Sequence, residues 1–311
     1  MMWKRGARAL FLTVLMAMVT NTAFAITIVF DYSYDTNGFF SDQNRKAVLE
    51  EAGSFLGNVL RDDFDPIISN DSNSFTARFT RPDTGATQEI ENFSVQRDTI
   101  KIFVGARELN NSTLGHGGPG GYYVSYSSYD WYVDAITRGE SPTISGVQGN
   151  DAYEFAPWGG AISFNEDVEW FFDSTPWDDS DLPGDKNDFF SVALHELAHV
   201  LGFGVSDSWE RLVNGYLFEG IKSTEIYGSN PPLYSDQSHW AKDTESTFMG
   251  HVQEAAMDPS LTIGTRKYLT DLDLAALDDI GWDVAPVPVP SALWLVGGGF
   301  VALLVRRARK G

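Results

Sequence analysis

One pentapeptide constrains the possible fold and chemistry of this chain more than any other stretch. His195-Glu196-Leu197-Ala198-His199 is an H-E-x-x-H motif, and Gly202 follows its second histidine at the third position. If the segment is helical, residues i and i+4 lie on one face, so both imidazole rings point at the same volume. Two neutral imidazoles one helical turn apart suit Zn²⁺, and the adjacent glutamate can take a proton from a metal-bound water. The motif therefore predicts a zinc-dependent peptidase, with a chance match on an ordinary amphipathic helix as the alternative.

The charge of the chain and its lack of cysteine exclude several classes of partner and ligand. The 311 residues carry a formal net charge of −21, which argues against nucleic acid and against anionic lipid surfaces. Without cysteine there is no disulfide framework and no thiolate for zinc. Histidine ligands must therefore come from five residues. These are His116, His195, His199, His239 and His251.

The N-terminus has the pattern of a secretory signal peptide. A basic start, an apolar run over residues 9–19 and the small residues Ala23-Phe24-Ala25 predict cleavage after Ala25. The alternative is an uncleaved membrane anchor, for which the apolar run is short. We therefore expect residues 1–25 to be removed and the mature protein to begin at Ile26.

The C-terminus carries a different signal, over residues 285–311. Val287-Pro288-Val289-Pro290 leads into an apolar stretch and then a basic cluster at 306–310. The stretch spans roughly 22 Å as a helix, short of the ~30 Å hydrocarbon core. It resembles the PEP-CTERM sorting signal of exopolysaccharide-producing Gram-negative bacteria, with Val289 where Glu is usual. This resemblance implies transient anchoring in the inner membrane and removal by an exosortase-like enzyme. A plain transmembrane anchor is the other interpretation, and either one exports the body of the protein.

Residues 26–284 have the pattern of one domain that mixes strands and helices. β-Branched residues and alternation predict strands over 26–32, 74–80, 89–95, 99–104 and 159–164. A helix is expected from a cap at Ser41 to about residue 61. A second helix carries the histidine motif from a cap at Asn187 or Asp188 to about residue 203. Residues 269–282 indicate a terminal helix that is capped near Thr270 and stopped at Gly281.

Two loops are expected to be ordinary surface features. The glycine-rich run Gly115–Gly121 lacks the Lys-Ser or Lys-Thr pair and the following helix of a phosphate cradle, so a flexible turn with an exposed His116 is expected. The acidic stretch over 178–188 could hold Ca²⁺. Its carboxylate spacing fits no dedicated calcium loop, so a solvated loop is favoured.

The third zinc ligand is not in the usual place. Catalytic zinc takes three protein ligands and keeps a fourth position for water. Ten positions after the first histidine, where the long form of the motif has its third histidine, stands Val205. Either a glutamate on a following helix serves instead, or an insertion displaces the third histidine. The candidates are Glu210 and Glu219 for the first route, and His239 and His251 for the second. Gly202 favours the insertion, because a left-handed glycine ends the helix and returns the chain toward the metal.

Taken together, these features resemble the metzincin superfamily of zinc endopeptidases, and within it leishmanolysin-like enzymes and PEP-CTERM-tagged bacterial metalloproteases. The resemblance rests on HELAHVLGFG (195–204), His239-Trp240, Met257-Asp258-Pro259 and the terminal helix. It implies a zincin fold of the α+β class, with a mixed, twisted sheet, an active-site helix and a C-terminal helix. It also favours His239 over His251 and places Met257 beneath the zinc as a packing floor.

The resemblance further implies an exported zinc endopeptidase. His195, His199 and His239 would bind one Zn²⁺, and Glu196 would act as general base on the zinc-bound water before passing its proton to the leaving amine. The alternative is a non-catalytic metal-binding surface or matrix protein that keeps the fold. Glu196 argues against it, because a structural zinc site needs no base beside its first ligand.

The expected substrate is a protein or peptide. The strand over 159–164 resembles the upper rim strand of matrixins, so an extended peptide is expected to pair with it by strand addition. Tyr268 or Tyr234 could stabilise the oxyanion, and the sequence does not choose between them.

Overall fold

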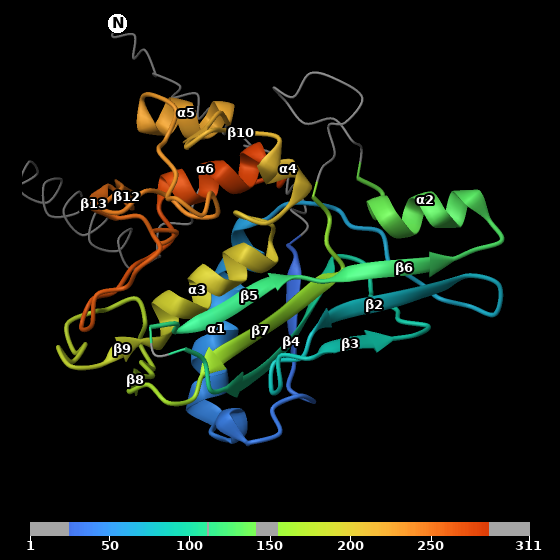
Figure 1. Cartoon of the computed structure of the whole chain (residues 1–311), viewed down its shortest axis with the longest axis horizontal. Helices are drawn as coiled ribbons and strands as arrows, with labels where there is room; N and C mark the ends of the chain where they lie inside the picture. The colour runs from blue at the N-terminus through green and yellow to red at the C-terminus, as the bar shows by residue number, and fades with distance from the viewer. Residues whose placement is uncertain (1–24, 111, 141–154, 286–311) are drawn as a thin grey trace, which may run out of the picture.

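The computed structural model describes residues 25–110, 112–140 and 155–285 (Figure 1). The predicted signal peptide, apart from Ala25, and the predicted sorting signal, apart from Ala285, lie outside these ranges. Among the helices in these ranges, none combines the length and the apolarity needed to cross a bilayer.

A four-stranded sheet with the order β1-β4-β7-β5 forms the centre of the molecule. β1 (Thr27–Asp31), β4 (Thr99–Arg107) and β7 (Gly159–Asn165) run parallel, and β5 (Gly115–Pro119) pairs antiparallel with β7. β7 is buried over its whole length, as its uninterrupted run of apolar and small residues requires. Within the described chain, β5 is the edge strand at the β7 end of this sheet.

Two helices pack on one face of this sheet (Figure 1). α1 (Gln43–Val59) contacts β1, and α3 (Phe189–Val200) contacts α1, β5 and β7. The Asp188 side chain accepts the N–H of Ser191 and so caps α3, which confirms one of the two predicted caps. β4 contributes every second residue to the core under the helices: Ile100, Ile102, Val104 and Ala106.

A second, smaller sheet covers the opposite face. β3 (Thr87–Ile90) and β6 (Gly121–Ser125) each pair antiparallel with β2 (Ser74–Thr80), and α2 (Tyr129–Thr137) follows β6. The apolar side of this sheet packs on Phe103 of β4 and Ala161 of β7, and the rings of Phe79 and Phe103 stack with centroids 4.2 Å apart. The central sheet is therefore covered on both faces.

Short elements and loops make up the remainder. Before α3 these are η1 (Phe39–Ser41), β8 (Trp170–Phe171) and β9 (Asn187–Asp188). After α3 come α4 (Asp207–Glu210), β10 (Val213–Asn214), β11 (Leu217–Phe218), α5 (Ile221–Tyr227), β12 (Glu245–Phe248), β13 (His251–Glu254) and α6 (Asp271–Asp279). Buried tryptophans tie this half to α3: the Nε1–H of Trp282 donates to the Leu201 carbonyl at 2.7 Å.

The glycine-rich run is a strand, so the prediction of a flexible turn was wrong. Gly115–Pro119 forms β5 and Gly121 begins β6. Glycine is needed here because β5 lies directly against α3: a Cβ at Gly117 would stand 2.4 Å from the Glu196 carbonyl oxygen. His116 is exposed, as expected.

The strand over 159–164 is not the rim of the sheet, contrary to prediction. β7 lies between β4 and β5, so its two edges are already occupied by ladder hydrogen bonds. A peptide cannot pair with an interior strand. The strand available for pairing beside the histidine motif is β5.

Candidate active site

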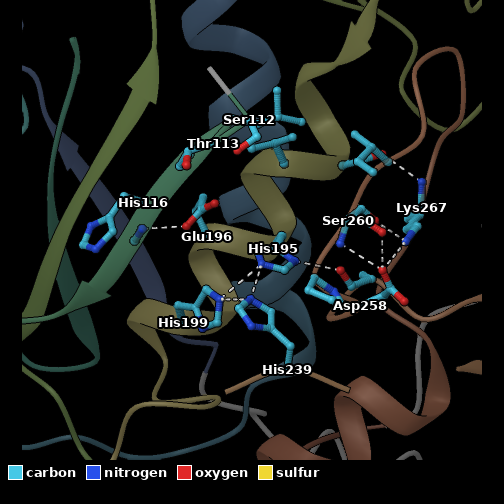
Figure 2. A pocket seen from close by; sticks show the side chains of 18 of the residues that line it. Ser112, Thr113, His116, His195, Glu196, His199, His239, Asp258, Ser260 and Lys267 are labelled. Atoms are coloured by element: carbon cyan, nitrogen blue, oxygen red, sulfur yellow. Dashed lines mark hydrogen bonds and ion pairs between the residues drawn. The ribbon is translucent and has the colours of Figure 1, made fainter. Parts of the chain in front are cut away.

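Three imidazoles converge beside α3 (Figure 2). His195 and His199 project from α3, and His239 comes from the segment before β12. The Nε2 atom of His195 lies 3.2 Å from each of the other two Nε2 atoms, which are 3.1 Å apart. Tetrahedral zinc with Zn–N bonds near 2.0 Å would hold its nitrogen ligands about 3.3 Å apart. The triangle therefore has the size of one face of a zinc tetrahedron.

The opposite ring nitrogens determine which tautomer each histidine adopts. Nδ1 of His195 lies 2.7 Å from the Ala256 carbonyl oxygen, Nδ1 of His199 lies 2.8 Å from that of Phe203, and Nδ1 of His239 lies 2.9 Å from a carboxylate oxygen of Asp236. These oxygens accept, so each Nδ1 carries the proton and each Nε2 presents a lone pair. Three lone pairs directed at one point repel one another unless a cation lies between them, so the donor set fits a metal ion.

Burial keeps two of these rings neutral. Burial first, and then the neighbouring His239, lower the pKa of His195 to about 3. Burial also lowers the pKa of His199, with His195 as the second cause. A neutral ring retains the lone pair that binds a metal, so these two rings are already in their ligating protonation state at neutral pH.

The structure brings His239, and not His251, to the histidine motif. Within the described ranges, these three histidines form the one group of three His, Cys, Asp or Glu residues whose ligand atoms lie close enough to hold a metal. His251 is exposed on β13. Glu210 and Glu219, the glutamate alternatives, do not belong to the group.

Glycines after α3 allow His239 to approach. Helix α3 ends at Val200, three residues earlier than predicted, and Gly202 then has the left-handed φ of 99° that its position suggested. Gly204, with φ 75°, meets the segment before the third histidine, since a Cβ there would lie 2.2 Å from the Ser238 carbonyl oxygen. The turn that ends the helix thus also makes room for the returning chain.

A buried carboxylate that was not predicted from the sequence holds the turn that orients His195. Asp273, in the first turn of α6, accepts the N–H groups of Ala256 at 3.0 Å and Met257 at 3.2 Å, and the Nε1–H of Trp240 at 2.8 Å. It also forms a capping box with Thr270. Met257 is fully buried. The capping-box spacing was the sequence signal for Asp273, but it indicated only a helix start.

Glu196 lies between α3 and β5 and has a second partner there (Figure 2). Its Oε2 accepts the Gly117 N–H at 2.5 Å, and the residue is 5% exposed. Burial raises the pKa of Glu196 to about 8, and the bond from Gly117 opposes that rise. A cation at the histidines would favour the ionised carboxylate, which is the form that can accept a proton.

A cleft of about 790 Å³ runs along these groups. Its apolar lining includes Leu114, Val168, Val192, Leu261 and Ile263. Tyr234 also lines it, whereas Tyr268 does not: the Tyr268 hydroxyl donates to the Pro176 carbonyl at 3.0 Å. Of the two tyrosines suggested for the oxyanion, the structure places only Tyr234 at the cleft.

Most of the acidic loop over 178–188 is exposed to solvent, as predicted, and an ion pair at Asp188 anchors its end. Arg266, whose side chain is fully buried, binds Asp173 at 2.8 Å and Asp188 at 2.6 Å. Its NH1 also donates to the carbonyls of Pro176 and Asp178. These contacts fix the loop against the N-terminus of α3. Among the described residues the loop contains no convergent metal-ligand group, so the structure gives no support for Ca²⁺ there.

Residues 132–225 match the matrixin family model. The match covers less than a third of the chain and contains His195, Glu196, His199 and Gly202, but ends before His239. It supports a zinc metalloprotease of the metzincin type. The mixed sheet, the helix with the histidine motif and the terminal α6 give the chain an α+β fold consistent with a zincin. Comparisons with curated proteins and with solved structures give no match.

Proposed function

We propose that this protein is an exported, leishmanolysin-like zinc endopeptidase. The observation that carries the proposal is the convergence of three Nε2 lone pairs beside a buried glutamate in the wall of a cleft. The matrixin match supports the chemistry. Export, and sorting by an exosortase-like enzyme after transient membrane anchoring, rest on the terminal sequence signals alone.

In the proposed mechanism His195, His199 and His239 would hold the metal. When bound, zinc supplies a water of lowered pKa and polarises the scissile carbonyl. Glu196 takes a proton from the attacking water and returns it to the leaving amine. The Gly117 N–H holds Oε2 of Glu196 and so restrains the direction in which this base faces. Tyr234 is the candidate to donate to the developing oxyanion from the cleft wall.

The proposed substrate site is the edge of β5 that does not pair with β7. The Gly120 N–H donates to Gly159 at the start of β7, so even-numbered residues of this strand direct their backbone groups toward β7. Gly115 and Gly117 then direct their backbone groups away from β7 and line the cleft, where the Gly117 N–H already binds Glu196. An extended peptide would pair with the backbone groups of this edge other than the Gly117 N–H and pass its scissile bond beside the three histidines.

The test uses the zinc-loaded protein with casein as substrate. Cleavage should stop on addition of a chelator and return with added Zn²⁺. Glu196→Gln should lower turnover by roughly 10²- to 10⁴-fold, because it removes the base, while zinc per chain stays unchanged. Glu210→Gln, which neutralises an exposed glutamate on α4, is the matched control and should retain activity. Bound zinc without any cleavage by the wild type would instead indicate the non-catalytic metal-binding protein.

A further inference from the structure

A second pocket lies across the start of β5 from the cleft. It encloses about 590 Å³ and is lined by Arg107, Glu108, Leu109, Asn110, Thr113 and His116. Two of these residues, Thr113 and His116, also line the cleft (Figure 2). The two cavities are therefore neighbours that share a wall at β5.

The two cavities lie on opposite faces of the central sheet. Gly115 and Gly117 face α3, because a Cβ on either would lie against Glu196. His116, between them, faces the other side. Arg107 faces that side too, since Ala106 before it belongs to the core under the helices. His116 and Arg107 thus reach the same outer face from β5 and β4.

The guanidinium of Arg107 is held in place but carries no counter-charge. Its Nε lies 3.4 Å from the hydroxyl of the buried Ser163, and the backbone at Gly85 lies against its tip, where a Cβ would come within 3.0 Å. In the part of the chain that the structure describes, it forms no ion pair. Arg78, Arg81, Arg97 and Arg266 each pair with a carboxylate. Glu108, at the pocket rim, is the acidic group nearest in sequence and opposes anion binding.

A peptide on β5 would present side chains to both cavities. Successive residues of a strand point to opposite faces, so if one substrate residue enters the cleft, its two neighbours face the side of His116. Resting on the proposed function, we infer that the second pocket is a subsite for an Asp or Glu side chain of the substrate. Arg107 binds the carboxylate, and His116 and Thr113 can add hydrogen bonds.

The experiment measures charge selectivity position by position. The probe is a neutral, internally quenched octapeptide with a single Glu placed in turn at each position, compared with the same peptides carrying Gln. At the peptide positions on either side of the residue that enters the cleft, the Glu/Gln ratio of kcat/KM should reach roughly five. At the position of the residue that enters the cleft, the ratio should stay near one. Selectivity that is equal at adjacent positions would overturn the inference, because strand alternation requires a difference.

Substitutions in the second pocket identify the residue that causes the Glu preference. Arg107→Gln should bring the ratio to about one, Arg107→Lys should retain part of it, and Glu108→Gln should increase it. Arg97→Gln removes the same charge from an exposed site before the other end of β4 and should leave the ratio unchanged. Because each ratio is taken within one variant, partial unfolding cancels. An unchanged ratio in Arg107→Gln would assign the selectivity elsewhere.

A binding measurement separates this inference from the proposed activity. The zinc-loaded Glu196→Gln variant should bind the Glu peptide more tightly than the Gln peptide, by calorimetry, and the difference should vanish when Arg107→Gln is added. That result without any cleavage by the wild type would preserve the pocket and reject the endopeptidase. Cleavage with no Glu preference at any position would preserve the endopeptidase and reject the acidic subsite.

Discussion

At the scale of single residues, Nδ1 decides the chemistry of the three histidines. Ala256, Phe203 and Asp236 supply the three acceptors, from three different segments. Each acceptor fixes one tautomer and one ring orientation, so the metal-facing nitrogens need no rearrangement before they bind. The glutamate beside them depends in the same way on a single N–H, that of Gly117.

Replacing the two downstream histidines separately tests the third ligand. His239→Ala should lose most of its zinc, because two imidazoles remain where a catalytic site needs three protein ligands. His251→Ala should keep about one zinc per chain, since that residue lies exposed on β13. Metal content by mass spectrometry after dialysis checks both, and equal zinc in the two variants would exclude His239 as a ligand.

At the scale of elements, α6 supports the site without touching it. Its capping aspartate, Asp273, is fully buried and binds the backbone of the turn at Ala256 and Met257. The Ala256 carbonyl of this backbone turn orients the His195 ring. The helix start and the metal site are therefore one hydrogen-bonded unit, and damage to the first should weaken the second.

Asp273→Asn tests this connection. One carboxylate oxygen becomes an NH₂ group that cannot accept, so at least one buried N–H loses its partner, at a cost of about 1–3 kcal/mol. We expect zinc affinity to fall roughly tenfold, by chelator competition, together with a lower Tm. Asp271→Asn is the control in the same helical turn, because that side chain binds Thr247 instead. If both variants bind zinc like the wild type, Asp273 has only a capping role.

At the scale of the whole molecule, the last described residues return to the end of α1 near Asp62. The Arg61 N–H donates to Asp283 and the Ala285 N–H donates to Val59, which joins the end of α1 to the last described residues. Asp62 is 4% exposed; its Oδ1 accepts the Asp283 N–H, and its Oδ2 has no partner. Burial first, with Glu140 and Asp283 as lesser causes, raises the pKa of Asp62 to about 7.

This carboxyl makes stability depend on pH. The pKa of this carboxyl is ~4 in the unfolded chain and about 7 in the folded protein, so between these pH values the folded state binds one proton more than the unfolded state. The stability that this proton contributes is therefore complete below pH ~4 and is lost as pH rises through 7. Asp62→Asn, neutral throughout, should raise Tm at pH 8 and leave it nearly unchanged at pH 4. The exposed Asp63→Asn should show no such difference. Thermal unfolding from pH 4 to 8 measures the dependence of Tm on pH. Parallel curves of Tm against pH for the wild type and Asp62→Asn would contradict the raised pKa of Asp62.

The parts of the fold that follow local rules were predictable. The cap at Asp188, the strand at 74–80, the left-handed Gly202 and the helix start at Thr270 each depend on neighbours in sequence, and each is confirmed. The prediction of a turn for the glycine-rich run was wrong because its structure depends on a distant segment. Locally, glycine indicates a turn, and only the close packing of β5 on α3 shows why a strand needs it.

By itself, the sequence determined His195, Glu196 and His199 as a unit, because one helical turn sets their mutual geometry wherever the helix lies. Only the tertiary structure decided the rest. It selected His239 over His251, assigned β5 rather than β7 as the cleft edge, and joined Asp273 to the turn that orients His195. Each of these depends on how distant segments close on one another, and residue spacing along the chain does not encode that closure.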